Sequence, residues 1–137
     1  MNKKNLSIDE IFDLAYQNYQ KNNNNLADNL CNNILKLNAK HFPSIFLLGA
    51  ISVRNKDYNS AKQLFQKAIK IKPDYVPAYN NLGAVYKEKG ELRRALNCFQ
   101  KTVEIQPDYA NGYYNLGNVL KELGEFEKAI SYYKKAA

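Results

Sequence analysis

The chain has 137 residues, 45% of them hydrophobic and 24% charged, a composition that allows a buried core and excludes an intrinsically disordered protein. Its formal net charge is +7, but the excess is spread along the chain, because residues 1–75 carry +5 and residues 76–137 carry +2. This distribution excludes a basic tail, and two distant cysteines without a CxxC pair argue against a disulfide framework or a zinc site.

The beginning of the chain lacks the features of a secretion signal. Lys3 and Lys4 are present, but Asp9, Glu10 and Asp13 interrupt any apolar run. The longest apolar stretch, Ile45–Ile51, is far shorter than the roughly 20 residues that span a bilayer. We therefore expect a cytoplasmic protein with no membrane insertion.

Residues 8–41 form the first of four similar segments. Apolar and small residues are spaced as on two helix faces, and Asn22–Asn25 fill the turn between them. The spaced residues are Ile11, Leu14, Ala15, Ala27, Cys31 and Ile34. This segment departs most from the pattern of the others, so we interpret it as a degenerate amino-terminal cap.

The same spacing returns with a period of 34 in residues 42–75, 76–109 and 110–137. Each segment predicts a helix, a short turn and a second helix, which Pro73 and Pro107 end in the second and third segments. The clearest segment carries Tyr79, Leu82, Gly83, Tyr86, Ala95, Phe99 and Pro107, and the last one stops inside its second helix.

These residues resemble the tetratricopeptide repeat, in which an aromatic residue, Leu-Gly, a tyrosine, an alanine, an aromatic residue and a proline recur at fixed offsets. The resemblance covers residues 8–137 and implies an all-α fold, an α-α superhelix or solenoid of about four repeats in one domain spanning residues 1–137. It also implies a concave groove, lined by the first helix of each repeat, that holds an extended or helical peptide. The groove residues that it indicates are Phe12, Tyr16, Phe46, Arg54, Asn80, Asn81, Lys87, Tyr114, Asn115, Asn118 and Lys121.

Asn81 and Asn115 occupy the same repeat position, so we expect their amides to lie in a row. An asparagine amide both donates and accepts hydrogen bonds, so it can pair with a peptide backbone of any sequence. The third and fourth repeats thereby resemble the superhelical repeats of O-linked N-acetylglucosamine transferases. The alternative is that asparagine is simply frequent at this position, as it is throughout the chain.

Phe12, Tyr16 and Phe46 are candidates for an apolar anchor pocket, although packing against one another would explain them equally well. A clamp for carboxyl-terminal acids, as in chaperone-binding repeats, is not expected. Its basic positions are held here by Phe46, Asn111 and Asn115.

The sequence offers little for catalysis. His41 is the only histidine and falls in a turn, while Cys31 and Cys98 fall at inward-facing helix positions typical of inert thiols. We expect no enzyme, no catalytic residue, no cofactor and no metal. The basic residues lie mainly on the second helices, where a solvated face explains them better than specific nucleic-acid binding.

Three functions are consistent with these observations. The leading one is a scaffold that binds a protein or peptide partner in the groove. The second is a targeting or substrate-recruiting segment of a larger enzyme, such as a glycosyltransferase or a sulfotransferase, and the third is self-association through the uncapped carboxy-terminal edge.

Overall fold

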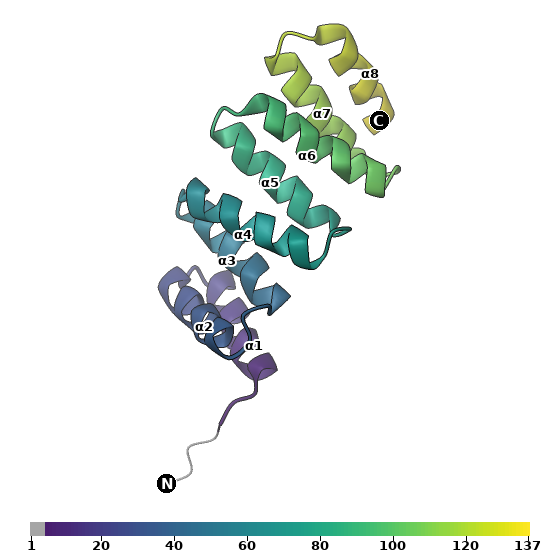
Figure 1. Ribbon diagram of the computed structural model, residues 1–137. Helices are drawn as coiled ribbons and strands as arrows, with labels where there is room; N and C mark the ends of the chain where they lie inside the picture. The colour runs from purple at the N-terminus through teal and green to yellow at the C-terminus, as the bar shows by residue number, and fades with distance from the viewer. Residues whose placement is uncertain (1–4) are drawn as a thin grey trace. The chain divides into compact units, whose positions relative to one another are not determined.

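The computed structural model describes residues 5–137, which form eight α-helices and no strand. The chain divides into two compact units, Met1–Ile71 and Lys72–Ala137. In the first unit, helices α1 (Ile8–Gln20) and α2 (Asn24–Leu37) form one hairpin, and α3 (Phe42–Arg54) and α4 (Tyr58–Ile71) form another. The second unit has the same order in α5 (Val76–Glu88), α6 (Leu92–Ile105), α7 (Ala110–Glu122) and α8 (Phe126–Ala136) (Figure 1).

The first helix of each hairpin begins 34 residues after the previous one, at Ile8, Phe42, Val76 and Ala110. The predicted all-α fold and its helix-turn-helix period are therefore confirmed.

A close contact between a glycine and an aromatic ring joins the two helices in three of the hairpins. A Cβ atom added to Gly49 would lie 2.6 Å from Cε1 of Phe65, and one added to Gly83 would lie 2.7 Å from Cε1 of Phe99. Gly117 has the same relation to the ring of Tyr133, at 2.6 Å. The missing side chain thus makes room for the ring, because protein interiors are packed without spare volume.

The turn inside each hairpin contains one residue with a positive φ angle. In the second unit these residues are Gly90 (φ 77°) and Gly124 (φ 82°). In the first unit the same register positions hold Asn22 (φ 64°) and Lys56 (φ 61°). The left-handed conformation is therefore required by the fold at this position, whichever residue the sequence supplies.

Several helix starts are fixed by local hydrogen bonds. Ser7 and Glu10 form a capping box at the start of α1, since each side chain accepts a hydrogen bond from the other residue's backbone N–H. At the start of α3, Nδ1 of His41 accepts a hydrogen bond from the backbone N–H of Ser44. His41 lies in the predicted turn, where it is only partly exposed and serves as a helix cap.

The core of each unit is built from the facing sides of its helices. In the first unit, buried residues of α1, α2 and α3 form one cluster, which consists of Ala15, Ala27, Cys31, Leu47, Leu48 and Ile51. In the second unit, Leu82, Val85, Leu116, Val119 and Leu120 are almost completely buried.

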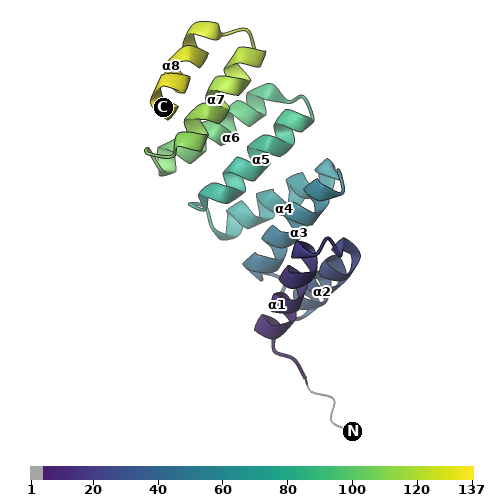
Figure 2. The same ribbon diagram turned by 180° about the vertical axis from the view of Figure 1, so that it is seen from behind.

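The second helices lie toward the viewer in the second unit in Figure 1, and the reverse view in Figure 2 brings α5 and α7 forward. The first helices thus present a surface of their own.

Candidate functional site

The predicted site residues all lie on first helices, which are α1 and α3 in the first unit and α5 and α7 in the second. We call the solvent-facing side of these helices the first-helix surface, and we describe it separately for each unit. One register position, the fifth residue of each repeat, holds Phe12, Phe46, Asn80 and Tyr114. The next position holds Asp13, Leu47, Asn81 and Asn115.

In the first unit, the rings of α1 pack against one another along the helix. The ring centroids of Phe12 and Tyr16 lie 6.4 Å apart in a stacked arrangement, and Phe12 also contacts the ring of His41 at 5.7 Å. Tyr16 keeps 47% of its surface exposed, whereas Phe12 is half-buried. Tyr16 is thus the more accessible of the two aromatic residues to a ligand.

Phe46 belongs largely to the interior of its own hairpin. Its ring stacks on Phe42 with centroids 6.0 Å apart and meets the ring of Phe65 edge-on at 5.6 Å. Phe65 is fully buried, so Phe46 forms the outer edge of an aromatic cluster that holds α3 against α4. Only part of this ring faces solvent.

Arg54 uses its guanidinium group to connect the two hairpins of the first unit. Its Nη1 atom donates hydrogen bonds to the backbone carbonyl of Tyr19 at 2.6 Å and to Oδ1 of Asn24 at 2.9 Å. The guanidinium carbon also lies 3.7 Å from the centroid of the Tyr19 ring, which is a close cation–π contact. The predicted groove cation is therefore engaged within the unit at the ends of α1 and α3.

In the second unit, an asparagine pair connects the first helices α5 and α7. The Nδ2 atom of Asn115 donates a hydrogen bond to Oδ1 of Asn80 at 2.8 Å, and both side chains are half-buried. The sequence suggested a row made of Asn81 and Asn115, which share a register position. The side chain that accepts the hydrogen bond from Asn115 is instead Asn80, which lies one register position before Asn81. The side chains of the neighbouring first helices meet at this position.

Asn81 and Asn118 differ in how far their hydrogen-bonding groups are used. Asn81 is half-buried, and its side chain makes no hydrogen bond within residues 5–137. Oδ1 of Asn118 accepts a hydrogen bond from the Tyr133 hydroxyl at 2.6 Å. The ring of Tyr133 also contacts Tyr114, at 5.8 Å between centroids, and Tyr114 leaves 55% of its surface exposed.

The two predicted lysines of this surface have different surroundings. Nζ of Lys87 lies 3.7 Å from Oε1 of Glu122, in an ion pair between α5 and α7. Lys121 is exposed and forms no ion pair with any residue in the range 5–137. The second unit thus offers amides, a phenol and one unpaired cation on its first helices.

Both thiols are buried and held in the neutral form. Burial raises the pKa of Cys31 from its ordinary value of 9.0 to about 12; Asp28 adds to this shift and a hydrogen bond with Ser44 opposes it. Burial alone raises the pKa of Cys98 to about 11. The thiolate is the reactive form of cysteine, and burial disfavours it at both positions.

Residues 5–137 contain neither a metal-binding cluster nor a membrane-spanning helix. Nowhere in that range do three histidine, cysteine, aspartate or glutamate side chains gather closely enough to hold a metal ion. None of its helices combines the length and the apolar character needed to cross a bilayer.

Comparisons with known proteins agree with this architecture. A family model described as tetratricopeptide repeat matches residues 74–137, and another described as TPR repeat matches residues 49–90. Curated proteins gave no match. A crystal structure of MamA superposes with a TM-score of 0.90 at 25% sequence identity, over 95% of this chain and 76% of that one. MamA from Desulfovibrio magneticus RS-1 superposes with a TM-score of 0.88 at 20% identity, over 95% of this chain and 73% of that one. The chain belongs to the tetratricopeptide repeat family.

Proposed function

We propose that this protein binds a polypeptide segment along the first-helix surface of its second unit. Membership of the tetratricopeptide repeat family makes the chain a protein-interaction scaffold in general terms. The observation that carries the finer proposal is the arrangement of Asn81 and Asn115, which are both partly exposed and retain unused hydrogen-bonding groups on neighbouring first helices.

The chemistry of these amides suits a peptide backbone. An asparagine side chain has two donors and a carbonyl acceptor, and Asn115 spends one donor on Asn80. That internal hydrogen bond fixes the orientation of Asn115, so less conformational entropy is lost when a ligand binds. The remaining donor and acceptor match the C=O and N–H of an extended chain, and Asn81 offers a complete set.

Neighbouring groups would add affinity and direction. Tyr114 presents an exposed ring for an apolar side chain, and aromatic residues supply much of the binding energy at interfaces. Lys121 adds a positive charge that favours an acidic residue in the ligand. In the first unit, Tyr16 and the exposed edge of Phe46 offer apolar contacts of the same kind.

The test uses peptides selected from a random library against the full chain, with affinities measured by calorimetry. Replacing Asn81 and Asn115 by alanine should weaken binding about tenfold, because two hydrogen bonds of about 0.5–1.5 kcal/mol each are lost. The matched control replaces two exposed asparagines of second helices, Asn29 and Asn97, and should leave affinity unchanged. Equal affinities for both double variants and the parent protein would contradict the proposal, provided circular dichroism shows that all three are folded.

Self-association is a second candidate function, favoured by the apolar side of α8. Phe126 and Ile130 lie one turn apart and are 61% and 52% exposed. Leu96, which holds the register position of Ile130 in the preceding hairpin, is only 9% exposed. A helix from a second copy could cover the α8 residues as Leu96 is covered. Light scattering over a range of concentrations tests this, and a constant monomer mass would rule it out.

A further inference from the structure

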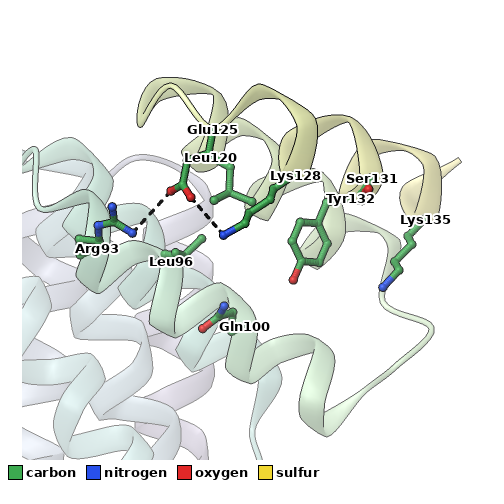
Figure 3. Close-up of a pocket in the computed structure, with 9 residues that line it drawn as sticks. All are labelled: Arg93, Leu96, Gln100, Leu120, Glu125, Lys128, Ser131, Tyr132 and Lys135. Carbon is green, nitrogen blue, oxygen red and sulfur yellow. Dashed lines mark hydrogen bonds and ion pairs between the residues drawn. The ribbon is translucent and has the colours of Figure 1, made fainter.

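A cleft lies between the second helices α6 and α8 of the second unit (Figure 3). Its volume is about 380 Å³, which is enough for one or two side chains of a ligand. Leu96 of α6 and Leu120 of α7 form an apolar floor and are only 9% and 4% exposed. The cleft is thus a hollow with a firmly packed base.

The rim of the cleft carries three cations and one anion. Glu125 lies between two of the cations, with Oε2 3.5 Å from Nη1 of Arg93 and Oε1 3.2 Å from Nζ of Lys128. Lys135 lies toward the other end of α8, with Nζ 5.4 Å from the centroid of the Tyr132 ring and 5.8 Å from that of Tyr113. The net charge around the hollow is therefore positive.

Glu125 neutralises only part of the positive charge of Arg93 and Lys128. The side chain of Glu125 is 31% exposed, whereas the side chains of Arg93 and Lys128 are 73% and 70% exposed. An arginine has five N–H donors and a lysine has three, so both retain donors for a ligand after pairing with one carboxylate. The carboxylate holds the two cations at the mouth of the cleft.

We propose that the α6–α8 cleft binds an acidic segment of another polypeptide. An apolar side chain of that segment would rest on Leu96 and Leu120, and its carboxylates would pair with Arg93, Lys128 and Lys135. This ligand accounts for both the apolar floor and the cationic rim of the same hollow.

A nucleic acid fits these features less well. Its affinity comes mainly from a series of phosphate contacts, and single-stranded binders place cations along a continuous groove. Here the cations lie at the two ends of a single hollow and not along a continuous groove. An acidic peptide needs only a few carboxylate contacts and gains from burying an apolar side chain.

The probe is a fluorescent peptide in which two leucines are placed among glutamates, measured by anisotropy with the full chain. Lys128→Gln with Lys135→Gln should weaken binding about fivefold, since two partly exposed charge contacts are lost. The control is Lys101→Gln with Lys134→Gln, which removes the same charge from exposed positions of α6 and α8 that lie outside the cleft. It should change affinity less than twofold.

Salt and site mapping provide independent readouts. Affinity of the parent protein should fall as ionic strength rises, because exposed charges are screened. In NMR spectra of the parent protein, the peptide should shift the backbone signals of Gln100, Ser131 and Tyr132, which line the cleft. This readout needs no variant, so it holds even where a substitution disturbs folding.

Three outcomes would overturn the proposal. The first is equal weakening by the two lysine pairs, which would indicate attraction to net charge alone. The second is the absence of binding or of shifts at the cleft. The third is tighter binding of an oligothymidylate strand than of the peptide. If the double variant Lys128→Gln with Lys135→Gln also binds that strand more weakly than the parent protein does, the cleft would be assigned to nucleic acid.

Discussion

The hairpin of α1 and α2 and the hairpin of α5 and α6 fill the same interhelical contact with different pairs of side chains. In the later hairpin, Gly83 faces the ring of Phe99, and an added Cβ would lie 2.7 Å from that ring. In the first hairpin, the corresponding positions hold Ala15 and Cys31, both completely buried. The smaller Cys31 leaves room for the methyl group of Ala15. The apparent degeneracy of the first repeat is therefore a matched pair of changes.

The two units also differ at the turn between paired helices. The second unit supplies glycine at each positive-φ position, whereas the first uses Asn22 and Lys56 there. A non-glycine residue in this conformation brings its Cβ close to the following carbonyl oxygen. The first unit therefore carries a backbone strain that the second unit avoids.

The largest expected effect on the free energy of unfolding comes from replacing Phe99, the ring of the Gly83–Phe99 contact. Replacing Phe99 by alanine should lower the free energy of unfolding by about 3–5 kcal/mol, because a buried ring is lost and a cavity remains. Replacing Cys31 by alanine removes a single heavy atom and should cost about 1 kcal/mol, the scale of small deletions in cores. Urea denaturation followed by far-ultraviolet circular dichroism measures both. Equal losses of unfolding free energy in the two variants would show that Phe99 and Cys31 contribute alike to their hairpins.

A smaller effect is expected on the opposite helix. Gly83→Ala should lower the free energy of unfolding by about 1–3 kcal/mol, because the new methyl group overpacks the contact with Phe99. Ala15→Gly should cost about 1 kcal/mol, from helix propensity and lost packing.

Coupling between the two positions gives the decisive control. Cys31→Phe alone should lower the free energy of unfolding, because the ring meets the methyl group of Ala15. Adding Ala15→Gly should restore part of that free energy, because the pair then matches the glycine and phenylalanine of the later hairpins. Additive effects in this double-mutant cycle would mean that the two positions are independent, contrary to the matched-pair interpretation.

The sequence predicted the helical hairpins well because the 34-residue period reports directly on buried positions. Leu82, Gly83, Ala95 and Phe99 recur at that period, and all of them are buried. The compensation between Ala15 and Cys31 could not be predicted from the repeat pattern. A residue's fit depends on its partner 16 positions later, and the pattern lists positions one at a time.

The candidate site was predicted less completely, because it depends on contacts between helices. Register alone placed Asn81 and Asn115 together, but the hydrogen bond joins Asn115 to Asn80. Arg54 fell on the expected helix, but nothing in the sequence indicated that Tyr19 and Asn24 would hold its guanidinium group. His41 gave no capping signal, since histidine is not among the preferred residues at that position.

The smallest expected effect concerns the turns, and it has opposite signs in the two units. Lys56→Gly should raise the free energy of unfolding by about 0.5 kcal/mol, because relief of the left-handed strain of about 1–2 kcal/mol exceeds the added entropy of the unfolded chain. Gly90→Lys should lower it by a similar amount, about 0.5 kcal/mol. At position 90 a Cβ would meet no described atom within 4 Å, so the cost there arises from the backbone angle alone. Urea midpoints of the two variants, compared with the parent protein, should therefore move in opposite directions. A loss of stability in Lys56→Gly would mean that side-chain contacts, and not the φ angle, decide which residue this turn accepts.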